Sequence, residues 1–173
     1  MRRKKGFSLI ELLIVVAIIL IIAAIAIPNL MEARMAANES SAAAALRTIT
    51  TAETTYFNTY PTVGYASSIG QLGGATPCSP TTTTACIIDN FLATATPGGT
   101  GKSGYYYQAT GVVTGGATFN DAYVLGAAPI TVHSTGNRDF CSINDGVLRS
   151  QMGNVGDIPV TATSTCLSFP VTQ

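Results

Sequence analysis

The stretch from Phe7 to Ile27 is the feature that most restricts what this 173-residue chain can form. It reads FSLIELLIVVAIILIIAAIAI, and only Ser8 and Glu11 interrupt its apolar character. As an α-helix rising about 1.5 Å per residue it would be about 30 Å long, which matches the hydrocarbon core of a bilayer. The sequence therefore predicts a helix that can span a membrane, preceded by the basic segment MRRKKG.

The carboxylate of Glu11 lies about one helical turn inside this apolar run. Moving an unpaired carboxylate towards the bilayer interior costs about 2.5–3.5 kcal/mol on insertion scales. No Lys, Arg or His lies elsewhere in the run. We therefore expect the partner of Glu11 to come from another chain, or from a new amine created near Phe7.

The residues Gly6-Phe7-Ser8-Leu9-Ile10-Glu11-Leu12, behind a short basic leader and ahead of a long apolar helix, resemble the class III signal of type IV pilins and type II secretion pseudopilins. The resemblance covers about the first thirty residues. It implies that a prepilin peptidase removes residues 1–6 by cutting between Gly6 and Phe7, and then N-methylates Phe7. It also implies that Glu11 is the intramembrane glutamate of the family and that Pro28 bends the helix.

Cleavage at that point would create a cationic amine at Phe7, four residues before Glu11. In a lone subunit the amine and the carboxylate would pair along the first helical turn. In a growing filament, Glu11 of an incoming subunit would instead pair with the Phe7 amine of its neighbour, which fixes axial register. This hypothesis gives Glu11 a role in assembly.

Two other interpretations account for the same apolar stretch. The first is an ordinary signal peptide, with Ala24-Ile25-Ala26 as an A-x-A cleavage site that releases a secreted domain. The second is a permanent single-span anchor in which Glu11 is incidental. A signal peptide rarely has so long an apolar run or a Glu within it, which favours the prepilin interpretation.

The distribution of charge agrees with an exported head. Four of the nine basic residues lie in the leader, so the remaining chain would carry five basic and nine acidic side chains. The basic leader orients the helix with its N-terminus in the cytoplasm. We therefore expect the chain in the inner membrane before assembly and in an extracellular filament afterwards. No basic tract lies outside the leader, so the sequence does not predict nucleic-acid binding.

All four cysteines, Cys78, Cys86, Cys141 and Cys166, lie in the exported part, which predicts two disulfides in an oxidising compartment. Three connectivities are possible. Local pairing, Cys78 with Cys86 and Cys141 with Cys166, is favoured because each bond closes a loop that otherwise lacks a core. The second pair resembles the C-terminal disulfide loop of many type IV pilins, which attaches the tail to the sheet.

The helix is expected to continue from Phe7 to about Tyr60, spanning the membrane as far as about Ile27. Its second half is amphipathic, because one face carries residues at spacings of three and four: Leu46, Ile49, Glu53, Tyr56, Phe57 and Tyr60. The small side chains of Ala36, Ala37 and Ala42 to Ala45 would let neighbouring helices approach closely, although helix propensity alone also explains them.

Residues 61–173 are expected to form a globular head. Prolines and glycine pairs mark residues 61–104 as a connector, held by Cys78–Cys86 and by apolar residues such as Leu72 and Leu92. Strand composition then appears at 105–110, 122–127, 138–143 and 147–150, with a hairpin turn at Asn144-Asp145-Gly146. The prediction is an α+β fold, with an antiparallel sheet joined in chain order and wrapped on the helix. This is the ladle-shaped architecture that the resemblance implies.

No catalytic motif is evident in the head, and we do not expect an enzyme. His133, the single histidine, has no neighbouring Cys or carboxylate motif and is expected at the surface. Neither a catalytic motif such as H-E-x-x-H nor a zinc-type cysteine spacing is present, so no metal site is assigned. Calcium is the one cofactor considered, since oxygen ligands are present in Asp139, Asn144, Asp145 and Asp157, although turn chemistry accounts for the second and third.

The expected function is that of a structural subunit of an extracellular type IV pilus, which polymerises through its N-terminal helix. Alternatives within the resemblance are a pseudopilin of a type II secretion system and a minor or DNA-uptake pilin. The implied partners are other copies of the chain, the prepilin peptidase, the inner-membrane assembly platform and the membrane itself. Cell adhesion is one of several uses of such filaments.

Overall fold

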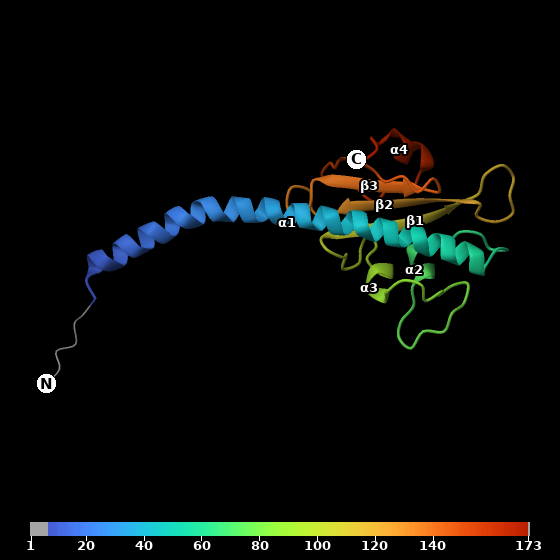
Figure 1. Cartoon of the computed structure of the whole chain (residues 1–173), viewed down its shortest axis with the longest axis horizontal. Coiled ribbons are helices and arrows are strands. Elements are labelled where there is room, and N and C mark those ends of the chain that lie inside the picture. Colours follow the sequence, from blue (N-terminus) through green and yellow to red (C-terminus); the bar gives the residue numbers. More distant parts are fainter. Residues whose placement is uncertain (1–6, 173) are drawn as a thin grey trace. The chain divides into compact units, whose positions relative to one another are not determined.

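The computed structural model describes residues 7–172 and divides into two compact units, which meet between Arg34 and Met35. Helix α1 (Leu9–Thr59) contributes to both units and is continuous through Pro28. The predicted helix from Phe7 to Tyr60 is thus confirmed within two residues at each end. The remaining elements, three short helices and four strands, belong to the second unit, which we call the head (Figure 1).

The head contains one antiparallel sheet whose strands are neighbours in chain order. Its strands are β1 (Tyr105–Val112), β2 (Ala122–Pro129), β3 (Arg138–Ile143) and β4 (Arg149–Met152). The predicted α+β fold, a long helix against a small antiparallel sheet, is confirmed (Figure 1).

Strand β4 begins two residues later than the sequence suggested. The Asp145 carboxylate accepts a hydrogen bond from the Val147 backbone N–H at 2.9 Å and one from the Arg149 guanidinium at 2.6 Å. These contacts hold residues 145–148 in a turn, so ladder pairing with β3 starts only at Arg149, opposite Cys141.

The core of the head lies between α1 and one face of the sheet. Alternate residues of β1, Tyr105 and Tyr107, are fully buried, as two-residue periodicity requires. The helix contributes the predicted stripe, of which Leu46, Ile49 and Tyr56 are fully buried in the same cluster. Two periodicities read from the sequence therefore meet in one core.

Alanines on the second half of α1 contribute to the core between the helix and the sheet. Ala42, Ala45 and Ala52 are buried in the main core cluster together with the tyrosines of β1. Ala44 is exposed on the opposite side of the helix. The buried alanines thus belong to the core of the head. Ala36, Ala37 and Ala44 are exposed, and the close approach of neighbouring helices there stays a prediction.

The opposite face of the sheet has a smaller apolar cluster formed with the C-terminal segment. This segment includes α4 (Thr163–Ser168), and the cluster contains Val124, Cys141, Cys166 and Phe169. A side chain at Gly126 of β2 would collide with the backbone of Val160, so the segment can lie on the sheet only where that glycine is.

The connector is held against the head by its own short helices. These are α2 (Ile69–Leu72) and α3 (Asn90–Ala93), which bury Leu72 and Leu92 in the core as predicted. The Asp89 carboxylate caps α3 by accepting a hydrogen bond from the Leu92 N–H.

Candidate assembly sites and candidate pocket

The first turn of α1 places Glu11 in a capping interaction. Ser8 precedes the helix, and its backbone N–H donates a hydrogen bond to Glu11 Oε2 at 2.9 Å. Glu11 is the third helical residue, so the carboxylate reaches back to the cap position as in a capping box. The positive end of the helix dipole lies at the same place and stabilises a negative charge there.

A partner for the Glu11 carboxylate therefore exists within the chain itself, which the sequence analysis did not foresee. The signal was present, because Ser8 and Glu11 have the S-x-x-E spacing of a capping box. The predicted partner, an amine at Phe7, would lie beside this hydrogen bond after cleavage. Phe7 is 79% exposed, and Gly6, the other residue of the predicted cleavage site, lies outside the described residues.

The apolar side chains that follow Glu11 have no partner within their own unit. Leu20, Ile25 and Leu30 are each more than 60% exposed. By length and composition, α1 is able to cross a membrane. An apolar surface of this extent is stable only when lipid or other polypeptide covers it. Pro28 lies inside this segment, and the bend at Pro28 stays a prediction.

The four cysteines form two disulfides, Cys78–Cys86 and Cys141–Cys166. The first closes the connector loop beside Gly74, where any side chain would collide with the Cys78 sulfur. The second joins β3 to α4 and lies in the apolar cluster on the outer face of the sheet. The C-terminal segment is thereby attached to the sheet by a covalent bond as well as by apolar contacts.

The residues considered for calcium fall into two groups. Asp139 is 3% exposed and lies beside Asp157, and burial together with a hydrogen bond to Asp157 raises the pKa of Asp139 to about 7. Asp145 is instead paired with Arg149, which lowers the pKa of that aspartate. Calcium prefers six to eight oxygens. Within residues 7–172 no three His, Cys, Asp or Glu side chains gather in a metal-binding cluster. A calcium site in the C-terminal loops stays a prediction.

Glu53 is a buried carboxyl group that sequence reasoning placed on the helix stripe without recognising its environment. It is fully buried, and Oε2 accepts a hydrogen bond from the Ala66 N–H at 2.9 Å, while Oε1 has no partner among the described residues. Burial raises the pKa of Glu53 to about 8. His133, by contrast, is exposed as predicted, with Nδ1 3.0 Å from Asn137 Oδ1.

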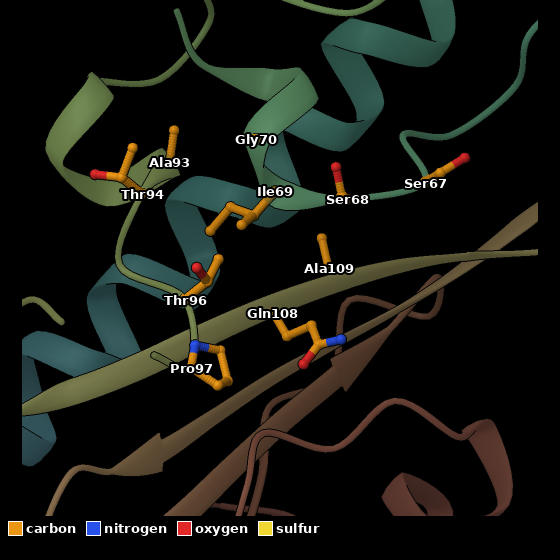
Figure 2. Close-up of a pocket in the computed structure, with 10 residues that line it drawn as sticks. All are labelled: Ser67, Ser68, Ile69, Gly70, Ala93, Thr94, Thr96, Pro97, Gln108 and Ala109. Atoms are coloured by element: carbon orange, nitrogen blue, oxygen red, sulfur yellow. The ribbon is translucent and has the colours of Figure 1, made fainter. Parts of the chain in front are cut away.

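A pocket of about 600 Å³ lies at the edge of the sheet. Figure 2 shows that its lining comes from three places: the start of α2, the end of α3 with the residues after it, and β1. Hydroxyl, amide and small apolar side chains line it, and none is charged: Ser67, Ser68, Ile69, Gly70, Ala93, Thr94, Thr96, Pro97, Gln108 and Ala109. Sequence reasoning did not predict this site, because its residues are spread over a connector and a strand.

Comparison with known proteins identifies the N-terminal region. Residues 1–27 match the family model of the prokaryotic N-terminal methylation motif. The type IV wide pilus major component PilA4 of Thermus thermophilus is 65% identical over 40 residues, which cover 23% of this chain and 30% of that protein. The type IV major pilin protein PilA of Myxococcus xanthus is 48% identical over 56 residues, covering 32% and 26%. No solved structure matches the chain.

The chain thus aligns with less than a third of the length of either pilin, and the head lies largely beyond the aligned part. Both relatives are named as pilus components. The fold agrees with this similarity, because a long apolar helix follows the methylation motif and an α+β head follows the helix. In its N-terminal region the chain is thus similar to type IV pilins and carries the prokaryotic N-terminal methylation motif.

Proposed function

We propose that this chain is the structural subunit of an extracellular type IV pilus. In this proposal a prepilin peptidase removes residues 1–6 and methylates Phe7, and an inner-membrane assembly platform then adds the subunit to a growing filament. The head stays on the outer side of the membrane throughout. No enzymatic activity is assigned to the chain.

The observation that carries the proposal is the start of α1. Its apolar side chains are exposed over the whole first unit, and one carboxylate, Glu11, lies at the N-terminal end of this surface. A bundle of identical helices would bury these side chains. Apolar surface removed from water contributes about 25 cal/mol per Å². Surface that leaves lipid contributes through van der Waals packing instead. The carboxylate would give the bundle its register by pairing with the Phe7 amine of the next subunit.

A pseudopilin that forms a short filament in a type II secretion system is the second candidate. It is supported by the hairpin of residues 140–149, which resembles the closing hairpin of pilin-like proteins with a pseudopilin character. The Cys141–Cys166 loop and the names of the two relatives favour the pilus subunit. A minor or DNA-uptake pilin has no observation of its own in this structure.

Replacement of Glu11 by alanine tests the proposal. We expect Glu11→Ala to be inserted and cleaved normally, but to give at least tenfold fewer surface filaments, because the incoming subunit loses its partner for the Phe7 amine. Glu32→Ala is the matched control, since Glu32 is an exposed glutamate on the same helix. Immunoblots of sheared filaments and of membranes measure both variants, and normal filament yield from Glu11→Ala would contradict the proposal.

A further inference from the structure

The turn between β3 and β4 contains the single Asp-Gly pair of the sequence, Asp145-Gly146, and no Asn-Gly pair occurs elsewhere. In such a pair the backbone nitrogen of the glycine can attack Cγ of the aspartate. An N–Cγ bond forms, the Cγ–OH bond breaks, and the hydroxyl group leaves with the amide proton as water. Glycine hinders this ring closure least, because it has no Cβ. Water then opens the succinimide, and one product is isoaspartate, so the whole reaction is an isomerisation without a co-reactant.

Packing does not prevent this reaction in the folded head. Asn144, Asp145 and Gly146 are all exposed, so water reaches the turn. Gly146 has a φ of 70°, and among residues 7–172 no atom lies within 4 Å of the place that its Cβ would take. Any protection of the turn must therefore come from its hydrogen bonds.

Both reacting groups of the pair are held by other residues. The N–H of Gly146 donates to Ile143 O at 2.9 Å. The Asp145 carboxylate accepts from the Val147 N–H at 2.9 Å, and Arg149 donates from Nη1 to Oδ1 at 3.2 Å and from Nη2 to Oδ2 at 2.6 Å. The guanidinium also lowers the pKa of Asp145. An ionised carboxylate is a poor electrophile here, because its oxygen must be protonated before it can leave as water.

Arg149 is itself fixed by the sheet. Its side chain is 10% exposed, and Nη1 also donates to Val147 O at 3.2 Å. Its backbone lies opposite Cys141 of β3 on one side and forms a β-bridge with Val171 on the other. The guanidinium therefore stays beside the Asp145 carboxylate for as long as β4 is paired.

We propose that Asp145-Gly146 is a site of isoaspartate formation that Arg149 keeps unreactive while β4 is paired with β3. Opening of the hairpin releases the carboxylate and the Gly146 N–H together, so a head that has opened acquires a covalent record of it. Isoaspartate adds a methylene group to the main chain of the turn. The added length shifts Arg149 from its place opposite Cys141, because turn length sets the register of a hairpin. The inference concerns the head alone and does not depend on filament assembly.

The test compares the full chain in detergent micelles with the same chain unfolded in urea, its disulfides intact, both at pH 6. Peptide mapping by mass spectrometry measures isoaspartate at residue 145, using an endoproteinase that cuts before aspartate but not before isoaspartate. We expect the unfolded chain to form isoaspartate about tenfold faster or more, since each unit by which the Asp145 pKa rises gives tenfold more of the protonated acid. Equal rates in the folded and the unfolded chain would overturn the proposal.

Variants separate the role of Arg149 from that of folding, which circular dichroism checks for each of them. Arg149→Gln should form isoaspartate about tenfold faster than the folded wild type, because the amide leaves Asp145 free to protonate. Arg149→Lys should stay several-fold slower than Arg149→Gln, because the ammonium keeps the carboxylate ionised. Arg138→Gln is the matched control, since Arg138 is paired with Glu39 instead, and should react as the wild type does.

Two results would contradict the role of Arg149. The first is a rate in Arg149→Gln no higher than in Arg138→Gln, and the second is an equal rate in Arg149→Gln and Arg149→Lys. If Arg149→Gln does not fold, Arg149→Lys decides against the wild type. A folded Arg149→Lys chain that reacts as fast as the unfolded wild type would then contradict the proposal.

Discussion

Glu53 illustrates how a single residue makes the head sensitive to pH. Its carboxyl group is fully buried, its one hydrogen bond is to the Ala66 N–H, and burial raises its pKa to about 8 from a usual value of 4.5. The folded state therefore holds a proton that the unfolded state releases. Stability is full below pH 4.5 and falls as the pH rises towards 8, by several kcal/mol in total at 1.36 kcal/mol per unit.

We expect Glu53→Gln to flatten this dependence, because the amide stays neutral and keeps an acceptor for Ala66. Between pH 5 and 8 the variant should lose less stability than the wild type, measured as the urea midpoint of the full chain in detergent. Glu32→Gln is the control for the loss of an exposed carboxylate. A wild type of constant stability across this range would contradict the assignment of a buried, protonated Glu53.

Asp139 contributes a second component in the same direction. Burial and the neighbouring Asp157 raise its pKa to about 7, so the folded state again loses stability as the pH rises towards 7. We expect Asp139→Asn to remove the pH dependence that Glu53→Gln leaves. The double variant should be nearly pH-independent between pH 5 and 8 in the same urea titrations. A steeper dependence of stability on pH in Asp139→Asn alone would contradict the raised pKa that we assign to Asp139 beside Asp157.

Among the elements, the C-terminal segment depends most on specific attachments to the sheet. Cys141–Cys166 joins β3 to α4, and Gly126 permits the close approach of Val160. A disulfide that closes a loop of this kind contributes about 2–4 kcal/mol. The segment buries Phe169 against the outer face but leaves Leu167 and Val171 largely exposed, so apolar burial alone holds it weakly.

Removal of the disulfide by Cys141→Ser with Cys166→Ser should destabilise the head by about 2–5 kcal/mol. Limited proteolysis should then cut within residues 153–172 first, because that segment loses its covalent attachment. The pair Cys78→Ser with Cys86→Ser is the comparison, since it should make the connector sensitive to protease and leave the C-terminal segment protected. Equal protection of the C-terminal segment in both double variants would contradict this description.

Gly126→Ala is a second test of the same attachment. The added methyl group would meet the Val160 backbone, so the C-terminal segment must shift away from β2 and expose Val124. We expect a loss of about 1–3 kcal/mol in the free energy of unfolding, as overpacking commonly costs. Gly98→Ala is the comparison in thermal scans, because a methyl group there would meet no other atom. Its cost should come only from the positive φ of that residue.

Periodicity explains which elements could be predicted from the sequence. The stripe from Leu46 to Tyr56 and the alternation of Tyr105 and Tyr107 are local patterns, so the helix, strands and core followed from them. The start of β4 could not, because it depends on where the Asp145 side chain finds its hydrogen bonds. The pocket beside β1 could not be predicted either, because its lining combines the connector with a distant strand.

At the scale of the whole molecule, the first unit and the head differ in how far their apolar side chains are exposed. The head buries its apolar side chains in two clusters, whereas the first unit exposes nearly all of them, with Glu11 at their start. A chain of this kind is stable only when its first unit is covered by lipid or by other subunits. Self-assembly after cleavage is the account that explains the motif, the helix and the carboxylate together.

Mass spectrometry of filaments sheared from the native cell surface tests that account most directly. We expect long fibres composed mainly of a chain that begins at N-methyl-Phe7 and carries two intact disulfides. Recovery of the same processed chain only from membranes would favour the secretion pseudopilin. A soluble chain that begins near Ile27 would contradict the account, because it would lack Glu11 and the helix through which the subunits are proposed to assemble.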